Sequence, residues 1–189
     1  MKNSILKMIA LLAAAVLLFS LCACNQKADG NNGGDATESE GAPNEETTVH
    51  SGNALPDFTV YSMEGEEVTL YEKFGKPLVV NFWATWCPPC KAEMPDFEKV
   101  YGEMGSSVEF MMINMTDGSR DTEASVKAFI EDNGYTFPVY LDSKMSAMYT
   151  YSVQSIPMTL FFSADGELVD YNVGAMSEQE LIEKIGKIK

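Results

Sequence analysis

Long apolar runs recur along residues 54–189 and predict the strands of a central sheet. The runs 78–83, 108–114 and 158–162 are apolar at nearly every position. Such continuous runs are typical of strands that are covered on both faces, whereas a half-exposed strand alternates between apolar and polar residues. A shorter run at 138–141 predicts one more strand. The pattern therefore indicates a sheet that lies between two covering layers.

Between these runs, apolar residues recur at helical spacing. Helices are expected over 91–104, from a cap at Asp121 or Thr122 to about 133, and over 144–149. A closing helix is predicted by the stripe Leu181, Ile182, Ile185 and Ile188.

Two further segments predict hairpins. The stretches 58–61 and 67–70 flank a Gly-containing turn at 63–66, and the run 158–162 is followed by an Ala-Asp-Gly turn and the stretch 167–173. The predicted order is ββ, βα, βα, βα, ββα, which is an α/β domain with a mixed sheet and helices on both faces.

The N-terminal residues 1–23 have the features of a secretory leader. Two lysines lie within the first seven residues, and residues 8–21 are almost wholly apolar, which is too short for an ordinary membrane span. The run ends Leu-Cys-Ala-Cys and resembles a bacterial lipoprotein cleavage box with Cys24 as the lipidated first residue. An uncleaved signal anchor is the alternative, and both interpretations tether the protein outside the cytoplasmic membrane.

Residues 24–53 predict a flexible tether. They are rich in Asn, Gly, Asp, Glu, Thr and Ser and show little apolar periodicity. A chain of about 29 residues has a typical span on the order of 30 Å, enough for a folded domain over 54–189 to move above a membrane surface.

Charge and composition exclude several classes of function. A formal charge of −15 argues against nucleic acid as a partner. The single histidine, His50, lies in the tether, so a metal site built on the paired cysteines lacks further ligands and none is expected. Lys91 follows the second of those cysteines where a c-type haem attachment motif needs histidine.

The candidate chemistry lies in Trp86-Cys87-Pro88-Pro89-Cys90, between the apolar run 78–83 and a predicted helix. Two sulfurs one helical turn apart can close a small disulfide ring, and a helix N-terminus favours a thiolate over a thiol. We therefore predict an exposed, acidic Cys87 and a less acidic, more buried Cys90. A permanent structural disulfide is the alternative, although so short a loop adds little stability.

Residues 81–95, from Asn-Phe-Trp through Cys-Pro-Pro-Cys to Glu-Met-Pro, are similar to the active-site segment of thioredoxin-fold proteins. More narrowly, residues 55–189 resemble the TlpA/ResA-type membrane-anchored thiol–disulfide oxidoreductases, with a redoxin or AhpC/TSA-like domain. The opening Leu-Pro-Asp-Phe, the stretch 136–139 and Ile156-Pro157 also match. The resemblance implies a thioredoxin-like fold with an N-terminal β-hairpin and a central βα insertion.

The resemblance implies roles for three reacting residues. Cys87 matches the cysteine that attacks a partner's disulfide, and Cys90 the resolving cysteine. Glu93 matches a glutamate that exchanges a proton with Cys90. An alternative for Glu93 is an acid that stabilises the first turn of the helix through its dipole.

Three more residues are implied to meet the substrate. Pro157 matches a cis-proline facing the cysteines, Ile156 offers backbone groups to an incoming peptide, and Trp86 forms a wall of the site. The chain departs from the pattern at Asn81, where cytosolic thioredoxins place a buried aspartate, and at Ser155 and Met158, where relatives often have Gly and Thr.

The resemblance further implies an extracytoplasmic monomer, anchored by lipid, that needs no cofactor beyond the Cys87–Cys90 disulfide. It is expected to reduce protein disulfides, as in cytochrome c maturation or oxidative-damage repair, with electrons from a membrane donor of the CcdA/DsbD type. The alternatives are a thiol peroxidase-type antioxidant and a non-enzymatic metal or haem chaperone.

Overall fold

The computed structural model describes residues 55–189. The predicted leader 1–23, the tether 24–53 and Cys24 lie outside the described residues. The elements, in chain order, are β1 (Thr59–Ser62), β2 (Glu67–Thr69), the 3₁₀ helix η1 (Tyr71–Lys73), β3 (Leu78–Trp83), α2 (Pro88–Met104), β4 (Glu109–Asn114), α3 (Glu123–Asn133), β5 (Val139–Leu141), α4 (Ser146–Thr150), β6 (Met158–Phe162), β7 (Leu168–Val173) and α5 (Glu178–Ile185).

The strands form one seven-stranded mixed sheet in the order β2-β1-β5-β4-β3-β6-β7. Strand β3 pairs in parallel with β4 and antiparallel with β6, and β4 pairs in parallel with β5. The pairs β1–β2 and β6–β7 are antiparallel, as expected of hairpins. The predicted mixed sheet is confirmed, and β3 and β6 have the predicted bounds.

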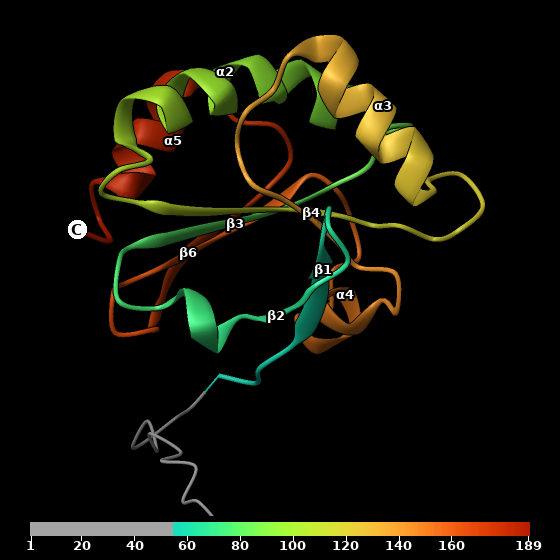
Figure 1. Ribbon diagram of the computed structural model, residues 1–189. Helices are drawn as coiled ribbons and strands as arrows, with labels where there is room; N and C mark the ends of the chain where they lie inside the picture. Colours follow the sequence, from blue (N-terminus) through green and yellow to red (C-terminus); the bar gives the residue numbers. More distant parts are fainter. Residues whose placement is uncertain (1–54) are drawn as a thin grey trace, which may run out of the picture. The chain divides into compact units, whose positions relative to one another are not determined.

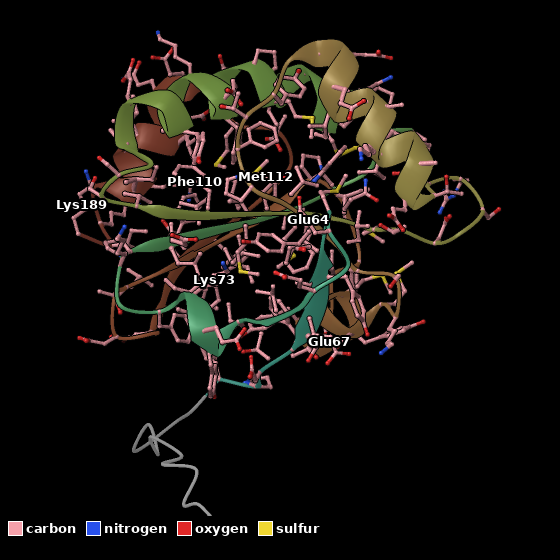
Figure 2. The ribbon with its side chains drawn as sticks, viewed as in Figure 1. Glu64, Glu67, Lys73, Phe110, Met112 and Lys189 are labelled. Carbon is pink, nitrogen blue, oxygen red and sulfur yellow. A yellow bond between two sulfur atoms is a disulfide. The ribbon has the colours of Figure 1, made fainter. Side chains whose placement is uncertain are left out.

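Both faces of the sheet are covered. Helices α2, α3 and α5 lie on one face, while η1 and α4 lie on the other (Figure 1). All six residues of β3 are buried, with Val79 and Trp83 in the core under α2 and Val80 and Phe82 in the opposite core. Figure 2 shows Phe110 and Met112 of β4 on the α2 side, and both belong to that core. The continuous apolar runs are thus explained by burial on two faces.

The start of α2 differs from the prediction, and the start of α3 decides between two predicted caps. Helix α2 begins at Pro88, three residues before the expected start, because Cys87 is the N-cap and prolines are tolerated in a first turn where N–H groups lack helical partners. Helix α3 is capped by Thr122, which forms a capping box with Ser125, so the alternative cap Asp121 is wrong. Within the described helices, no segment is long and apolar enough to cross a membrane.

The closing helix is shorter than its apolar stripe. Helix α5 ends at Ile185, and Ile188 lies beyond it but remains buried in the core under α2. The stripe predicted the buried face correctly, whereas the helix stops one turn earlier.

Candidate active site

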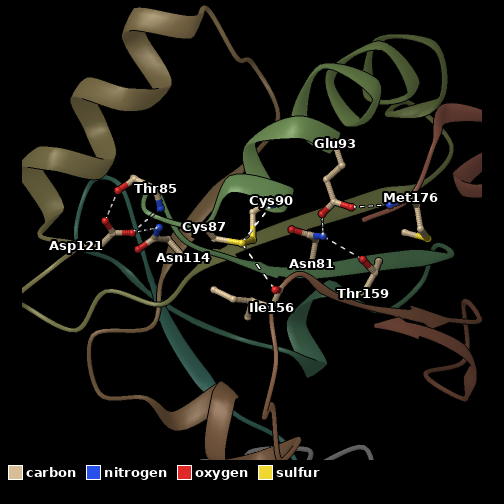
Figure 3. Close-up of a disulfide and its surroundings, with 10 residues drawn as sticks. All are labelled: Asn81, Thr85, Cys87, Cys90, Glu93, Asn114, Asp121, Ile156, Thr159 and Met176. Carbon is tan, nitrogen blue, oxygen red and sulfur yellow. Dashed lines mark hydrogen bonds between the residues drawn. A yellow bond between two sulfur atoms is a disulfide. The ribbon is translucent and has the colours of Figure 1, made fainter. Parts of the chain in front are cut away.

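The paired cysteines lie where β3 leads into α2. They form a disulfide in the structure, with Cys87 at the N-cap of the helix and Cys90 in its first turn (Figure 3). The buried strand β3 fixes the segment before Cys87, and the buried face of α2 fixes the segment after it. The pair therefore lies between a fully buried strand and a helix whose inner face is in the core.

The helix N-terminus directs a donor at Cys87. The backbone N–H of Cys90 points at the Cys87 Sγ, 3.2 Å away. Pro88 and Pro89 have no N–H, so Cys90 supplies the first backbone donor of α2. This donor and the positive end of the helix dipole favour negative charge on the Cys87 sulfur when the disulfide is reduced.

The expected exposure of Cys87 is wrong for this oxidised form. Cys87 is 4% exposed and Cys90 is fully buried. The Cys87 Sγ lies 3.7 Å from the carbonyl oxygen of Ile156, and Cys87 packs into the core under α2, which covers most of the side chain. The order of accessibility is as predicted, so Cys87 presents the only exposed edge of the pair.

The predicted substrate residues surround that edge. The Ile156–Pro157 peptide bond is cis, as the resemblance implied, and Ile156 is half-buried beside Cys87. Trp86, directly before Cys87, is 37% exposed. These positions fit an approach of a partner's backbone to Cys87, while the roles themselves stay predictions.

Glu93 is a buried acid behind the disulfide. It is 2% exposed, and its carboxylate oxygens accept hydrogen bonds from Asn81 Nδ2 and from the backbone N–H of Met176, each at 2.9 Å (Figure 3). It lies beyond the first turn of α2, so the alternative role as a first-turn acid does not fit.

The environment of Glu93 makes it a weak acid. Burial raises its pKa to about 7, while the hydrogen bonds from Met176 and Asn81 lower it and the charge of Asp96 raises it. A carboxyl group with this pKa exchanges protons readily near neutral pH. The raised pKa suits a proton carrier, and proton exchange with Cys90 stays a prediction.

Asn81 bridges Glu93 to strand β6. Its Nδ2 donates to Glu93 Oε1 and also to the Thr159 hydroxyl, 3.0 Å away, whereas Asn81 Oδ1 is buried with no hydrogen-bond partner within residues 55–189. The sequence singled out Asn81 as a departure from the thioredoxin pattern, but it gave no sign of this pairing across 78 positions.

A second polar cluster was missed by the sequence analysis. The Asp121 carboxylate is fully buried and accepts hydrogen bonds from the backbone N–H of Thr85 at 2.8 Å, from the Thr85 hydroxyl, and from Asn114 Nδ2 at 2.8 Å (Figure 3). It fixes the segment just before Cys87. The available signal was an aspartate at the end of a loop that follows a buried strand, which we interpreted as a cap.

The groups around the cysteines offer no metal centre. Within residues 55–189, no three His, Cys, Asp or Glu side chains are grouped so that they could hold a metal ion. The chemistry of the site as it stands is that of the two sulfurs and a nearby carboxyl group.

The fold is a mixed sheet with helices on both faces, and the site is a Cys-x-x-Cys disulfide at a helix N-terminus with a cis-proline loop beside it. Together they define a thioredoxin-like thiol–disulfide oxidoreductase. Residues 51–171 match the AhpC/TSA family, and the chain belongs to that family. The predicted fold class, family and enzyme class are thereby confirmed.

Individual relatives agree with this class. The thiol-disulfide oxidoreductase ResA of Halalkalibacterium halodurans is 34% identical over 142 residues, which cover 75% of this chain and 78% of that protein. The crystal structure of StoA from Bacillus subtilis is similar with a TM-score of 0.61 and 31% identity, covering 69% of this chain and 97% of that one. The pneumococcal exposed lipoprotein thioredoxin Etrx1 from Streptococcus pneumoniae has a TM-score of 0.61 and 26% identity, covering 69% of this chain and 98% of that one.

Proposed function

We propose that this thiol–disulfide oxidoreductase works as a reductant of disulfides in proteins outside the cytoplasmic membrane, through Cys87 and Cys90. The observation that carries the proposal is the position of Cys87, with the Cys90 N–H 3.2 Å from its sulfur and only its outer edge exposed next to Ile156.

The proposed reaction has two exchanges. The Cys87 thiolate attacks one sulfur of the partner's disulfide, that bond breaks, and the first partner sulfur leaves as a thiolate that takes up a proton. Cys90 then loses its proton and attacks the Cys87 sulfur of the mixed disulfide, releasing the second partner sulfur. Two electrons pass to the partner, and the Cys87–Cys90 disulfide remains.

In this scheme Glu93 takes the proton of Cys90 during the second exchange. Support comes from its burial behind the disulfide and its pKa of about 7, which lets the carboxyl group accept a proton and return it near neutral pH. Asn81 cannot titrate and holds the carboxylate in place.

The proposed location is the outer side of the cell membrane, with a lipid on Cys24 and the tether 24–53 between anchor and domain. Support comes from the leader-like residues 1–23 and from the name of the similar Etrx1, an exposed lipoprotein. We propose a monomer that is recharged by a membrane donor of the CcdA/DsbD type. Substrates in cytochrome c maturation or in oxidative-damage repair fit this location.

The test compares three activities of the reduced protein side by side. We expect the wild-type protein to reduce insulin disulfides and Cys87→Ser to lose this activity. We also expect no consumption of peroxide and no tight binding of Cu(I). Rapid peroxide consumption would instead support the thiol peroxidase, and Cu(I) binding without insulin reduction would support a metal chaperone.

The anchor has a separate test in intact cells. The wild-type protein is expected in the membrane fraction, and Cys24→Ala is expected to leave that fraction or to retain an uncleaved leader. A Cys24→Ala protein with an unchanged mass and an unchanged membrane fraction would contradict lipidation at Cys24.

A further inference from the structure

Arg120 is the only arginine in the chain, and it lies against the active site. Its guanidinium carbon is 3.7 Å from the centre of the Trp86 ring, which places the cation over the face of the aromatic residue next to Cys87. Arginine stacks well on aromatic faces because its guanidinium group is planar and weakly hydrated.

The guanidinium group is held in place from its own loop. Asp117 Oδ2 accepts a hydrogen bond from Arg120 Nε at 3.0 Å, and Asp117 Oδ1 accepts from the backbone N–H groups of Ser119, Arg120 and Asp121. These bonds lower the Asp117 pKa to about 2, so the carboxylate is charged at neutral pH. The arrangement is formed before any partner arrives, which reduces the entropy lost on binding.

The same loop is bonded to the segment that carries the nucleophile. The fully buried carboxylate of Asp121, next to Arg120, accepts hydrogen bonds from the backbone N–H and the hydroxyl of Thr85. Arg120 therefore touches Trp86 while its neighbour holds Thr85, and the loop 117–121 is fixed relative to Cys87 through two consecutive residues.

Part of the guanidinium group remains open. The Arg120 side chain is 58% exposed, and within residues 55–189 its only hydrogen-bond partner is Asp117, which takes Nε and leaves both terminal amino groups available. Two parallel N–H donors in one plane fit a carboxylate. In a chain of charge −15, the two open amino groups over Trp86 offer an acidic group a pair of donors close to Cys87.

We propose that Arg120, stacked on Trp86, is a substrate-recognition site that binds a carboxylate side chain flanking the disulfide attacked by Cys87. The inference rests on thiol–disulfide exchange at Cys87 and adds a preference in substrate sequence. The preferred partner presents Asp or Glu within a residue or two of its reactive cysteine, with the acidic side chain lying on the Trp86 side.

The test uses two peptides of identical composition, each with one intramolecular disulfide and blocked ends. One carries a single Glu next to the attacked cysteine, and the other carries that Glu at the far end of the peptide. Equal net charge cancels the long-range field of the protein. Reduced wild-type protein is expected to react about fivefold faster with the first peptide, since a charge-assisted contact at a partly exposed site has this order of effect.

Arg120→Gln is expected to abolish the preference, and Arg120→Lys to retain only part of it because lysine lacks the planar pair of donors. Lys127→Gln is the matched control, because it removes one exposed positive charge from α3. It is expected to keep the wild-type preference. A second measurement needs no variant. In about 0.5 M salt, the ratio of the wild-type reaction rates with the two peptides should fall towards one.

Equal rates for the two peptides with wild-type protein would overturn the carboxylate site. A preference that persists in Arg120→Gln, or that does not change with salt concentration, would overturn it as well. Insulin reduction by the same samples separates this claim from the function itself. Wild-type protein that reduces insulin but does not distinguish the peptides retains the dithiol chemistry and lacks the proposed recognition.

Discussion

Glu93 and Asn81 face each other between helix α2 and strand β3, and neither side chain reaches solvent. A buried carboxylate is stabilised by the hydrogen bonds it accepts, and here the donors are one side-chain amide and one backbone N–H. The proton affinity of Glu93 is thus set by burial, by two hydrogen-bond donors and by the charge of Asp96, and the Asn81 donor can be removed by substitution.

Glu93 should make the stability of the protein depend on pH. Burial raises its pKa from the ordinary value of 4.5 to about 7 in the folded protein, so the folded state holds this proton more tightly than the unfolded state does. Its contribution is fully present below about pH 4.5 and is lost as the pH rises through 7, with a total of about 3 kcal/mol. Urea unfolding of the oxidised wild type and Glu93→Gln from pH 4 to pH 8 measures the difference.

Glu93→Gln cannot ionise, so the free energy of unfolding of the variant should fall less than that of the wild type over this range. The other acids titrate in both proteins and cancel in the comparison. Parallel pH profiles for the two proteins would show that Glu93 titrates as an ordinary exposed acid.

Asn81→Ala should raise the pKa of Glu93 above 7, because it removes the amide donor that stabilises the carboxylate. Thr159→Val is the matched control, since it removes the other hydrogen bond of the same amide and leaves Glu93 with its donor. Carboxyl ¹³C NMR titration of Glu93 follows the change. A Glu93 pKa in Asn81→Ala that equals the one in Thr159→Val would be inconsistent with this role of Asn81.

At the scale of secondary-structure elements, the loop between β4 and α3 holds the start of the active-site helix. Asp121→Ala deletes a buried acceptor of three hydrogen bonds and leaves the Thr85 N–H and Asn114 amide without their partner. The expected cost is about 3 kcal/mol in the free energy of unfolding, with faster hydrogen exchange at the Thr85 amide.

Asp121→Asn keeps the shape and one acceptor oxygen, so its loss in stability should be smaller. Denaturant unfolding and amide exchange on the oxidised proteins measure both effects. Substitutions at exposed surface positions usually change the free energy of unfolding by no more than about 0.5 kcal/mol. If the free energy of unfolding of Asp121→Ala lies within that range of the wild-type value, the buried acceptor does not stabilise the loop.

The bounds of a helix or strand could be predicted where a single local sequence pattern determines them. Strands β3 and β6 have continuous apolar runs, and their bounds came directly from those runs. The start of α2 was misplaced because two prolines normally interrupt helices, whereas at the first turn they do not. Asp121 was misinterpreted because a cap and a buried acceptor use the same residue type, and only its contact with Thr85 distinguishes them.

The paired cysteines could be predicted from the sequence because their chemistry lies within four consecutive positions. The surroundings could not, because they join positions far apart in the chain. Glu93 meets Met176 across 83 positions, and Thr85 meets Asp121 across 36. The same packing covers Cys87 more fully than its place at a helix start suggested.

At the scale of the whole molecule, the excess of acidic groups should act on partners before contact. A formal charge of −15 attracts basic proteins and repels acidic ones over distances of about the Debye length, which is roughly 10 Å at 0.1 M salt. We expect exchange with a basic disulfide protein to slow severalfold between low salt and about 0.2 M salt.

A small uncharged disulfide is the control, because its reaction with reduced protein should not respond to salt. Stopped-flow fluorescence, with Trp86 beside the cysteines as the reporter, measures both rates. A salt effect of equal size on the uncharged disulfide would point to the chemistry of the sulfurs instead of long-range attraction.

The most direct measurement on the proposed chemistry is capture of the mixed disulfide. Reduced Cys90→Ser protein, mixed with a disulfide-containing protein substrate, is expected to hold that substrate through Cys87, and peptide mass spectrometry identifies the linked sulfur. The matched Cys87→Ser protein should capture little, because the sulfur of Cys90 is fully buried. Equal capture by Cys87→Ser, or no capture at Cys87 by Cys90→Ser, would contradict Cys87 as the attacking residue.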